Sequence, residues 1–290
     1  MGLTLAGLIR ERARDHGDEP AIVFEGDVTT YADLDRRSNH VVHALRAAGV
    51  GRGDRVAIID RNGPEFFELL FGTAKLGAVL VAVNWRLAPS EMAFIVADAT
   101  AAVLVVGPEV VDQLDEIGEL PLVRLIVGLG HGPGFVAYED WLADQPDDDP
   151  GVATDDEDVV VQMYTSGTTG LPKGALTTNA NFAAQLALVS GLVGLAECST
   201  VLTVMPLYHI AGLANALLGL SSGAGDGPVR PALIGNRHTS LWRHRQWWHS
   251  VMHRAPTSAC RRSRLPRHQT VHWPARVAWQ SPGRQTVNWS

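Results

Sequence analysis

The amino-acid sequence predicts an α/β protein with doubly wound, mostly parallel sheets and flanking helices, followed by an irregular tail. In the first half of the chain, short apolar runs alternate with longer segments of helical periodicity. The apolar runs contain no regular polar positions, which is typical of strands buried on both faces of a parallel sheet. With 290 residues, 46% of them apolar, the chain can bury a large core.

Capping residues mark the first two predicted helices. Thr30 can cap a helix whose apolar side chains recur with helical spacing as far as Gly49. The following run, 55–60, is rich in apolar and β-branched residues and predicts a strand. Pro64 then suits the first turn of a second helix, and Gly77 suits its end.

The same alternation continues along the chain, with one interruption. An acidic run punctuated by Pro and Gly occupies residues 144–158. We expect this run to be a solvated linker and not a metal site, because consecutive acids in a loop rarely converge on one ion. The other predicted segments are strands at 79–84, 102–107, 123–128, 159–164 and 200–208, and helices at 89–99, near 108–117 and from about Asn179.

Composition favours a cytoplasmic protein without an integral membrane segment. No long, uncharged apolar run of membrane-spanning length occurs, and the N-terminus lacks the basic leader of a secretory signal. Cys198 and Cys260 are the only cysteines, which excludes a disulfide framework and a cysteine-based metal cluster. The sequence does not indicate an oligomeric state.

Charge divides the chain into two parts. Residues 231–290 contain ten arginines and no acid, together with six of the eight tryptophans. Helical and strand periodicity both end near Ser221. We therefore predict a folded part over residues 1–225 and a basic, poorly ordered tail over residues 226–290. The tail is either an arm that binds nucleic acid or a membrane surface, or the out-of-frame translation of a GC-rich gene, and the abrupt loss of pattern favours the second.

The stretch 163–179, MYTSGTTGLPKGALTTN, has the residues of an anion-binding turn between a buried strand and a helix. Its glycines allow positive φ and close approach to a bulky ligand. Successive N–H groups in such a turn converge on an anion, with hydroxyl groups as further donors and a lysine as a point charge. The lysine here, Lys173, precedes the last glycine, unlike the lysine of the common P-loop.

YTSGTTGLPKG, residues 164–174, resembles the signature loop of the AMP-forming adenylate-forming superfamily, which includes acyl-CoA synthetases, luciferases and peptide-synthetase adenylation domains. Residues 30–87 resemble the N-terminal helix–strand–helix block of that family. MPLYHIAGL, residues 205–213, resembles its next motif and favours the acyl-CoA synthetases. The resemblance covers roughly residues 3–220, so the predicted folded part is similar to a partial N-terminal adenylation (AMP-binding) domain.

The resemblance implies a two-step ligase reaction. A small-molecule carboxylic acid, of fatty-acid or related type, attacks the α-phosphate of ATP·Mg²⁺, and coenzyme A then takes the acyl group from the acyl-adenylate. His209 would line the substrate side as the candidate catalytic residue, although a buried histidine hydrogen-bonded beside a strand end also fits the sequence. No residue of the chain is assigned to the metal. The phosphate contacts carried over from the family are Thr165, Ser166, Gly167, Thr168, Thr169, Gly170 and Lys173.

Several family motifs have no counterpart after MPLYHIAGL. Neither Tyr-Gly-x-Thr-Glu nor Tyr-x-Thr-Gly-Asp occurs, no lysine follows Lys173, and no acid follows Asp226. We therefore expect an N-terminal portion of the enzyme that is impaired in turnover by itself. Two other classes stay open: a non-catalytic fragment that binds a nucleotide or a partner, and binding of nucleic acid through the basic tail, although we expect no nucleic acid partner.

Overall fold

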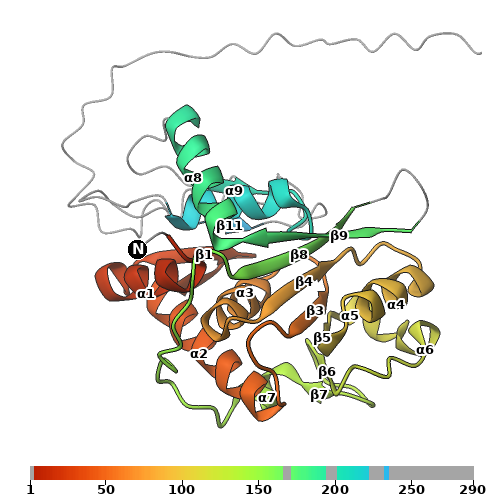
Figure 1. Cartoon of the computed structure of the whole chain (residues 1–290). Helices are drawn as coiled ribbons and strands as arrows, with labels where there is room; N and C mark the ends of the chain where they lie inside the picture. Colours follow the sequence, from red (N-terminus) through yellow and green to blue (C-terminus); the bar gives the residue numbers. More distant parts are fainter. Residues whose placement is uncertain (1–2, 166–170, 194–200, 222–231, 235–290) are drawn as a thin grey trace, which may run out of the picture.

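The computed structural model describes residues 3–165, 171–193, 201–221 and 232–234. These residues form an α/β fold in which helices cover both faces of a larger sheet, and a second, smaller sheet is present (Figure 1). The larger sheet has the strand order β7 (Val136–Ala137), β6 (Leu125–Gly128), β5 (Ala101–Val106), β3 (Arg55–Ile59), β4 (Val79–Val83), β8 (Val159–Thr165) and β9 (Lys173–Thr178).

Parallel pairing dominates the larger sheet. Ile58 of β3 lies opposite Ala82 of β4 on one side and Val105 of β5 on the other, and both pairs of strands are parallel. Because β4 and β5 extend the sheet in opposite directions from β3, the sheet is doubly wound, which confirms the predicted fold class. β8 continues the parallel pairing beside β4, and β9 is antiparallel to β8 at the edge of the sheet.

Two apolar cores lie on opposite faces of the larger sheet. Val56 and Ile58 of β3 belong to one core, and Ala57 and Ile59 belong to the other, as the alternation of side chains along a strand requires. The first core packs against α1 (Leu5–His16), α2 (Tyr31–Ala47), α3 (Pro64–Leu76), α7 (Tyr138–Leu142), α8 (Asn179–Val193) and α9 (Ile210–Ser221), and the second against α4 (Pro89–Asp98), α5 (Pro108–Val111) and α6 (Leu114–Ile117).

No helix within the described ranges is long and apolar enough to span a membrane.

The smaller sheet contains a strand from the predicted tail. Its order is β10 (Val201–Thr203), β11 (Ala232–Ile234), β1 (Pro20–Phe24) and β2 (Asp27–Thr30). β11 pairs in parallel with both β1 and β10, so it lies between the N-terminal segment and the segment that leads to the MPLYHIAGL motif. Part of the run 226–290, which the sequence analysis placed in an irregular tail, therefore forms regular structure.

The capping residues predicted for α2 and α3 are confirmed, whereas α1 was not predicted and α2 ends at Ala47, before Gly49. The Thr30 side chain accepts a hydrogen bond from the Asp33 N–H at the start of α2, which satisfies one of the unpaired donors of the first turn. Pro64 is the first residue of α3, and Gly77 ends that helix at φ 74°, a left-handed conformation that favours glycine.

Two predicted elements differ from the structure. The helix expected near 108–117 is two separate short helices, α5 and α6. The strand expected at 200–208 is limited to β10, and the chain turns after Pro206, whose carbonyl accepts the His209 N–H at 3.1 Å. Proline has no N–H to donate to a neighbouring strand, so the apolar run cannot continue as a ladder.

The acidic linker is irregular, as expected, but it is fastened to the helices beneath it. Asp147 accepts a 2.5 Å hydrogen bond on its side chain from His40, and its backbone carbonyl accepts one from the Asn39 amide at 2.8 Å. Asp149 forms a two-pronged ion pair with Arg10 of α1. The run is thus exposed over most of its length, as expected of a solvated linker, and contacts from α1 and α2 hold it along the surface.

Candidate nucleotide-binding site

The predicted phosphate loop connects two antiparallel strands. Thr165, at the end of β8, is paired with Lys173, at the start of β9, and the strand continues to Thr178 before α8 begins. The expectation of a strand–turn–helix arrangement was therefore wrong, because a whole strand separates the loop from the helix. Ser166, Gly167, Thr168, Thr169 and Gly170 lie outside the described residues.

Lys173 and Thr165 are both exposed at the two ends of the loop. The only other lysine of the sequence, Lys75, is completely buried. Its ammonium donates to Asp35 at 2.6 Å and to Asn39 at 2.5 Å. Of the two lysines, Lys173 is therefore the one that can reach a ligand in solvent.

Two side-chain hydrogen bonds support the base of the loop. The Tyr164 hydroxyl donates to Asp98 at the end of α4 at 2.5 Å, and it accepts a hydrogen bond from the Gln162 amide at 3.0 Å. Burial and the Asp98 carboxylate raise the pKa of the Tyr164 hydroxyl, so this donor stays protonated at neutral pH. A Cβ at Gly174 would lie 2.4 Å from Gln162 Nε2, so a larger residue here would displace the Gln162 side chain.

This support was not predicted from the sequence, because it depends on distant residues. Asp98 and Tyr164 are separated by 66 positions, and neither stands out by composition. The alternation of Gln162 and Tyr164 around buried Met163 was the signal available in the sequence, since these two side chains point to the face of the sheet opposite Met163.

His209 lies between β10 and α9. Its side chain is exposed, and its ring is 4.7 Å from the ring of Tyr208, with the planes tilted by 56°. The His209 carbonyl accepts the Leu213 N–H at 3.0 Å, so this residue immediately precedes the first turn of α9. The alternative of a buried histidine at a strand end is wrong. No hydrogen bond or ion pair joins His209 to Thr165 or Lys173, and all three lie within the described residues.

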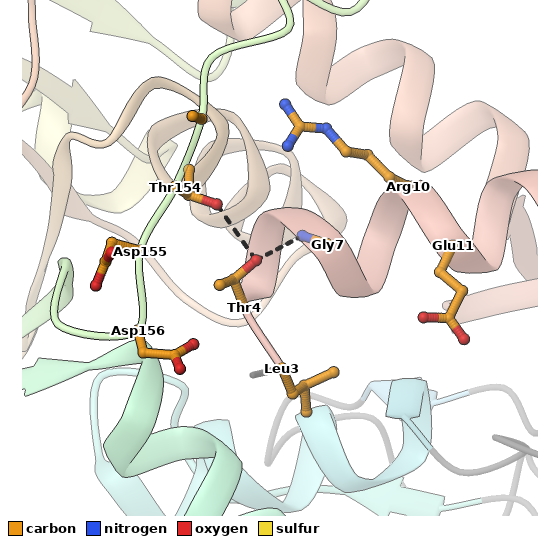
Figure 2. Close-up of a pocket in the computed structure, with 9 residues that line it drawn as sticks. Leu3, Thr4, Gly7, Arg10, Glu11, Thr154, Asp155 and Asp156 are labelled. Atoms are coloured by element: carbon orange, nitrogen blue, oxygen red, sulfur yellow. Dashed lines mark hydrogen bonds between the residues drawn. The ribbon is translucent and has the colours of Figure 1, made fainter. Parts of the chain in front are cut away.

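The cavity of about 610 Å³ shown in Figure 2 lies elsewhere, at the start of α1. Thr4 caps α1 there by accepting the Gly7 N–H, and it also contacts Thr154 of the acidic linker. The cavity is lined by the carboxylates of Glu11, Asp155 and Asp156. These three carboxylates outnumber the one guanidinium that lines the cavity, that of Arg10. The net negative charge disfavours a nucleoside triphosphate, and the hairpin remains the better phosphate site.

The donors of the hairpin suit phosphate and not a metal ion held by the protein alone. Lys173 and Thr165 offer a positive charge and a hydroxyl group. Within the described ranges, no group of three or more His, Cys, Asp or Glu side chains is placed to hold a metal. A divalent ion at this site would need oxygen ligands from the phosphates and from water.

The family described as AMP-binding enzyme matches residues 9–241. This span includes the hairpin, the MPLYHIAGL motif and strand β11, and it extends beyond the boundary predicted at residue 225. The chain belongs to the AMP-binding enzyme family. The match covers more than half of the sequence, and it agrees with the resemblance of the phosphate loop and of residues 30–87.

Curated relatives in this family are ligases. The chain is 37% identical to a fatty acid–[acyl-carrier-protein] ligase, ScoC, of Streptomyces coeruleorubidus over 225 residues, which are 76% of this chain and 42% of the relative. It is also 37% identical to a feruloyl-CoA synthase of an Amycolatopsis species over 207 residues, 71% of this chain and 40% of the relative. The chain thus spans well under half the length of the curated relatives it matches.

A solved structure supports the same fold. The inhibitor-bound N-terminal domain of FACL13 from Mycobacterium tuberculosis superposes with a TM-score of 0.71 at 28% sequence identity. The superposition covers 80% of this chain and 56% of that domain. The fold described for this chain is therefore part of the N-terminal domain of the AMP-binding enzymes.

Proposed function

We propose that this chain forms the N-terminal, phosphate-binding part of an AMP-forming ligase of the acyl-CoA synthetase type. The observation that carries the proposal is the β8–β9 hairpin, in which the exposed residues Thr165 and Lys173 pair at the two ends of the loop. The named relatives support this class of reaction, since one is a fatty acid ligase and another is a CoA synthase.

In this proposal the hairpin binds the β- and γ-phosphates of ATP. Lys173 and the hydroxyl and N–H donors of the loop stabilise the negative charge that develops on the leaving pyrophosphate. Donors that are fixed before the reaction stabilise such charge more than donors that must reorient. The hydrogen bonds of Tyr164 to Asp98 and Gln162 hold the base of the loop for this purpose. The remaining donors of the loop are Ser166, Gly167, Thr168, Thr169 and Gly170.

His209 and the cofactors complete the proposal. Mg²⁺ bound with ATP would neutralise phosphate charge, and coenzyme A is the proposed acyl acceptor. The exposed His209 ring, carried on the turn before α9, would face the carboxylic acid. We propose a fatty or related acid as the substrate, because MPLYHIAGL is similar to the corresponding motif of acyl-CoA synthetases.

We also propose that the 290-residue chain binds ATP better than it turns it over. The chain spans 42% of ScoC, and its sequence contains no lysine after Lys173 and no acid after Asp226. The family resemblance implies that the complete reaction needs a later lysine, which contacts the reacting carboxylate, and later acids, which bind Mg²⁺ and ribose. Without such groups the reactants are not held in a fixed geometry, and much of the rate enhancement that comes from this positioning is lost.

Pyrophosphate release tests this function. The chain is incubated with ATP, Mg²⁺ and a panel of aliphatic and aromatic carboxylic acids, with and without coenzyme A. Acid-dependent release that falls in Lys173→Ala and is partly retained in Lys173→Arg is the expected result. Release that is unchanged in Lys173→Ala would exclude the hairpin as the phosphate site. ATP binding without any release would favour a non-catalytic nucleotide-binding fragment.

A further inference from the structure

Asn62 connects the larger sheet to the MPLYHIAGL motif. It lies in the loop between β3 and α3, and its side chain is buried, with 8% of the residue exposed. The amide Nδ2 donates to the Met205 carbonyl at 3.0 Å, and the amide Oδ1 accepts the Leu207 N–H at 2.9 Å. One side chain therefore binds backbone groups on both sides of Pro206, more than 140 positions away in the sequence.

These two hydrogen bonds replace a strand partner. The carbonyl and the N–H of residues two apart in an extended segment point to the same side, and a neighbouring strand normally binds both. The residue between them here, Pro206, has no N–H of its own. A side-chain amide has one donor group and one acceptor group in a plane, so it can bind both backbone groups at once.

The segment that Asn62 holds leads directly to His209. Leu207 and Tyr208 are buried, and the Tyr208 ring is in contact with the His209 ring. The His209 N–H is bound to the Pro206 carbonyl, and a Cβ at Gly212 would overlap that same carbonyl oxygen. The turn thus has little room to move against α9, and Asn62 fixes it against the larger sheet.

We infer that Asn62 is a positioning residue for the proposed ligase reaction. It holds residues 205–209 against the end of β3 and so sets the place of the His209 ring on the substrate side. This inference rests on the proposed function for its effect on the substrate, whereas the contact itself is a property of the fold. The expected consequence is a change in the use of the carboxylic acid with little change in the use of ATP.

Asn179 provides a matched control. It is also a buried asparagine, with 1% exposed, and it also binds two distant backbone groups with one amide. Its Oδ1 accepts the Leu5 N–H at 2.9 Å, and its Nδ2 donates to the Asp155 carbonyl at 2.8 Å. Asn179→Ala therefore removes an equivalent pair of hydrogen bonds at the junction of α1 and the acidic linker, and neither of them involves the MPLYHIAGL motif.

Residue-resolved amide hydrogen exchange of the full chain tests the contact. In Asn62→Ala, the Leu207 N–H loses its acceptor, and we expect its exchange to accelerate about tenfold or more. Asn62→Asp retains an oxygen at Oδ1 and should accelerate the exchange less, and it also serves if the alanine variant does not fold. Unchanged Leu207 exchange in Asn62→Ala, or equal acceleration in Asn179→Ala, would overturn the inference.

Acid-dependent pyrophosphate release tests the effect on the substrate. We expect Asn62→Ala to raise KM for the carboxylic acid about tenfold while KM for ATP stays within about twofold of the original chain. Equal increases in both constants, as from general loss of fold, would contradict the positioning role. If the original chain releases no pyrophosphate, the proposed turnover fails and with it the effect of Asn62 on the substrate, and the exchange experiment alone decides whether Asn62 holds the motif.

Discussion

At the scale of single residues, the two lysines show how differently one side chain is used. Lys75 is buried on α3, where burial lowers the pKa of its ammonium group and the Asp35 carboxylate opposes that effect. Lys173 is exposed beside the loop. A buried ammonium must be paired at all times, whereas an exposed one is free to bind phosphate. The environment, and not the residue type, separates the structural lysine from the candidate ligand-binding one.

Asp60 provides a prediction on pH dependence. It follows β3, and burial raises the pKa of its carboxyl group to about 7, with Glu65 and Glu109 nearby. The folded state binds this proton more tightly than the unfolded state does. Its contribution to the free energy of unfolding is therefore fully present below about pH 4, the usual pKa of an aspartate, and is lost as the pH rises through about 7.

Asp60→Asn removes this titration while it keeps the shape of the side chain. We expect the variant to exceed the original chain in free energy of unfolding at pH 8, by about 4 kcal/mol at most. The difference should shrink as the pH falls from 8 to 5. Urea unfolding followed by circular dichroism at pH 5, 6.5 and 8 measures it, and a difference that is constant with pH would contradict the prediction.

Residues with local signals were predictable, and residues with distant partners were not. Thr30 and Gly77 are residue types that cap helices, so they predict helix ends, and the structure confirms both. Asn62 and Asp98 act on segments far away in the sequence, so no local pattern reveals them. The loop residues Ser166 to Gly170, predicted from family resemblance, stay predictions.

At the scale of elements, β9 is the strand that the sequence did not reveal, whereas the helix expected from about Asn179 begins there as α8. Residues 173–178 contain Gly, Ala and three Thr or Lys residues, and β9 is an exposed edge strand without an apolar run. Edge strands pair on one side only and need no continuous apolar sequence. The buried central strands, by contrast, were found at nearly their observed limits, because burial on both faces makes them uniformly apolar.

The contact between α2 and α3 depends on a glycine. A Cβ at Gly72 would lie 2.5 Å from Val41 Cγ1 and 3.0 Å from the Ser38 carbonyl oxygen, too close for either. Gly72→Ala should therefore destabilise the chain by roughly 1–3 kcal/mol despite the better helix propensity of alanine. Urea unfolding measures this change.

Gly51→Ala is the control for that prediction, since nothing lies within 4 Å of a Cβ at Gly51. We expect its midpoint of unfolding to stay close to that of the original chain. If Gly72→Ala were as stable as Gly51→Ala, the two helices would have room to separate, and the close packing described for them would be wrong.

The acidic linker is expected to open when its ion pairs are removed. Arg10→Ala removes the two contacts to Asp149, so cleavage within residues 144–158 by a protease should become several-fold faster. Arg14→Ala is the control, because Arg14 is paired only with its neighbour Asp15 in the contacts described. Global stability should change by less than about 1 kcal/mol in both variants. Equal cleavage rates would show that Arg10 does not hold the linker.

At the scale of the whole molecule, exposed apolar side chains gather in one region of the sequence. Among the described residues, seven of them fall between positions 171 and 210, on the segment before β9, on β9, α8 and β10, on the segment after β10, and at the start of α9. Large exposed apolar side chains favour association when they lie together on a surface. The FACL13 domain extends beyond the part that this chain matches. The residues are Leu171, Leu176, Leu188, Leu202, Val204, Met205 and Ile210.

From these seven exposed side chains we predict that the chain self-associates. Leu188 of α8 is 65% exposed, and Leu188→Gln should lower the fraction of associated chain measured by sedimentation velocity. Leu122→Gln, at a residue 53% exposed outside this region, is the matched control and should change association less. Equal effects of the two substitutions would mean that association does not use this surface.

The C-terminal limit of the folded part is a property of the whole molecule. The predicted boundary at residue 225 rested on the loss of periodicity, yet β11 at Ala232–Ile234 lies between β1 and β10. A three-residue strand is too short to give a periodic signal. We propose that the family-like part continues at least through β11. The frame shift and the basic arm were predicted for residues 226–290, which lie outside the described residues except for 232–234, and both stay predictions.

Titration of the full chain with Mg·ATP by calorimetry tests the central claim, that the β8–β9 hairpin binds the phosphates of ATP. We expect binding by the original chain, a Kd about tenfold or more higher in Lys173→Ala, a smaller increase in Lys173→Arg, and no change in Arg14→Ala. Absence of binding by the original chain, or the same Kd in Lys173→Ala, would contradict it.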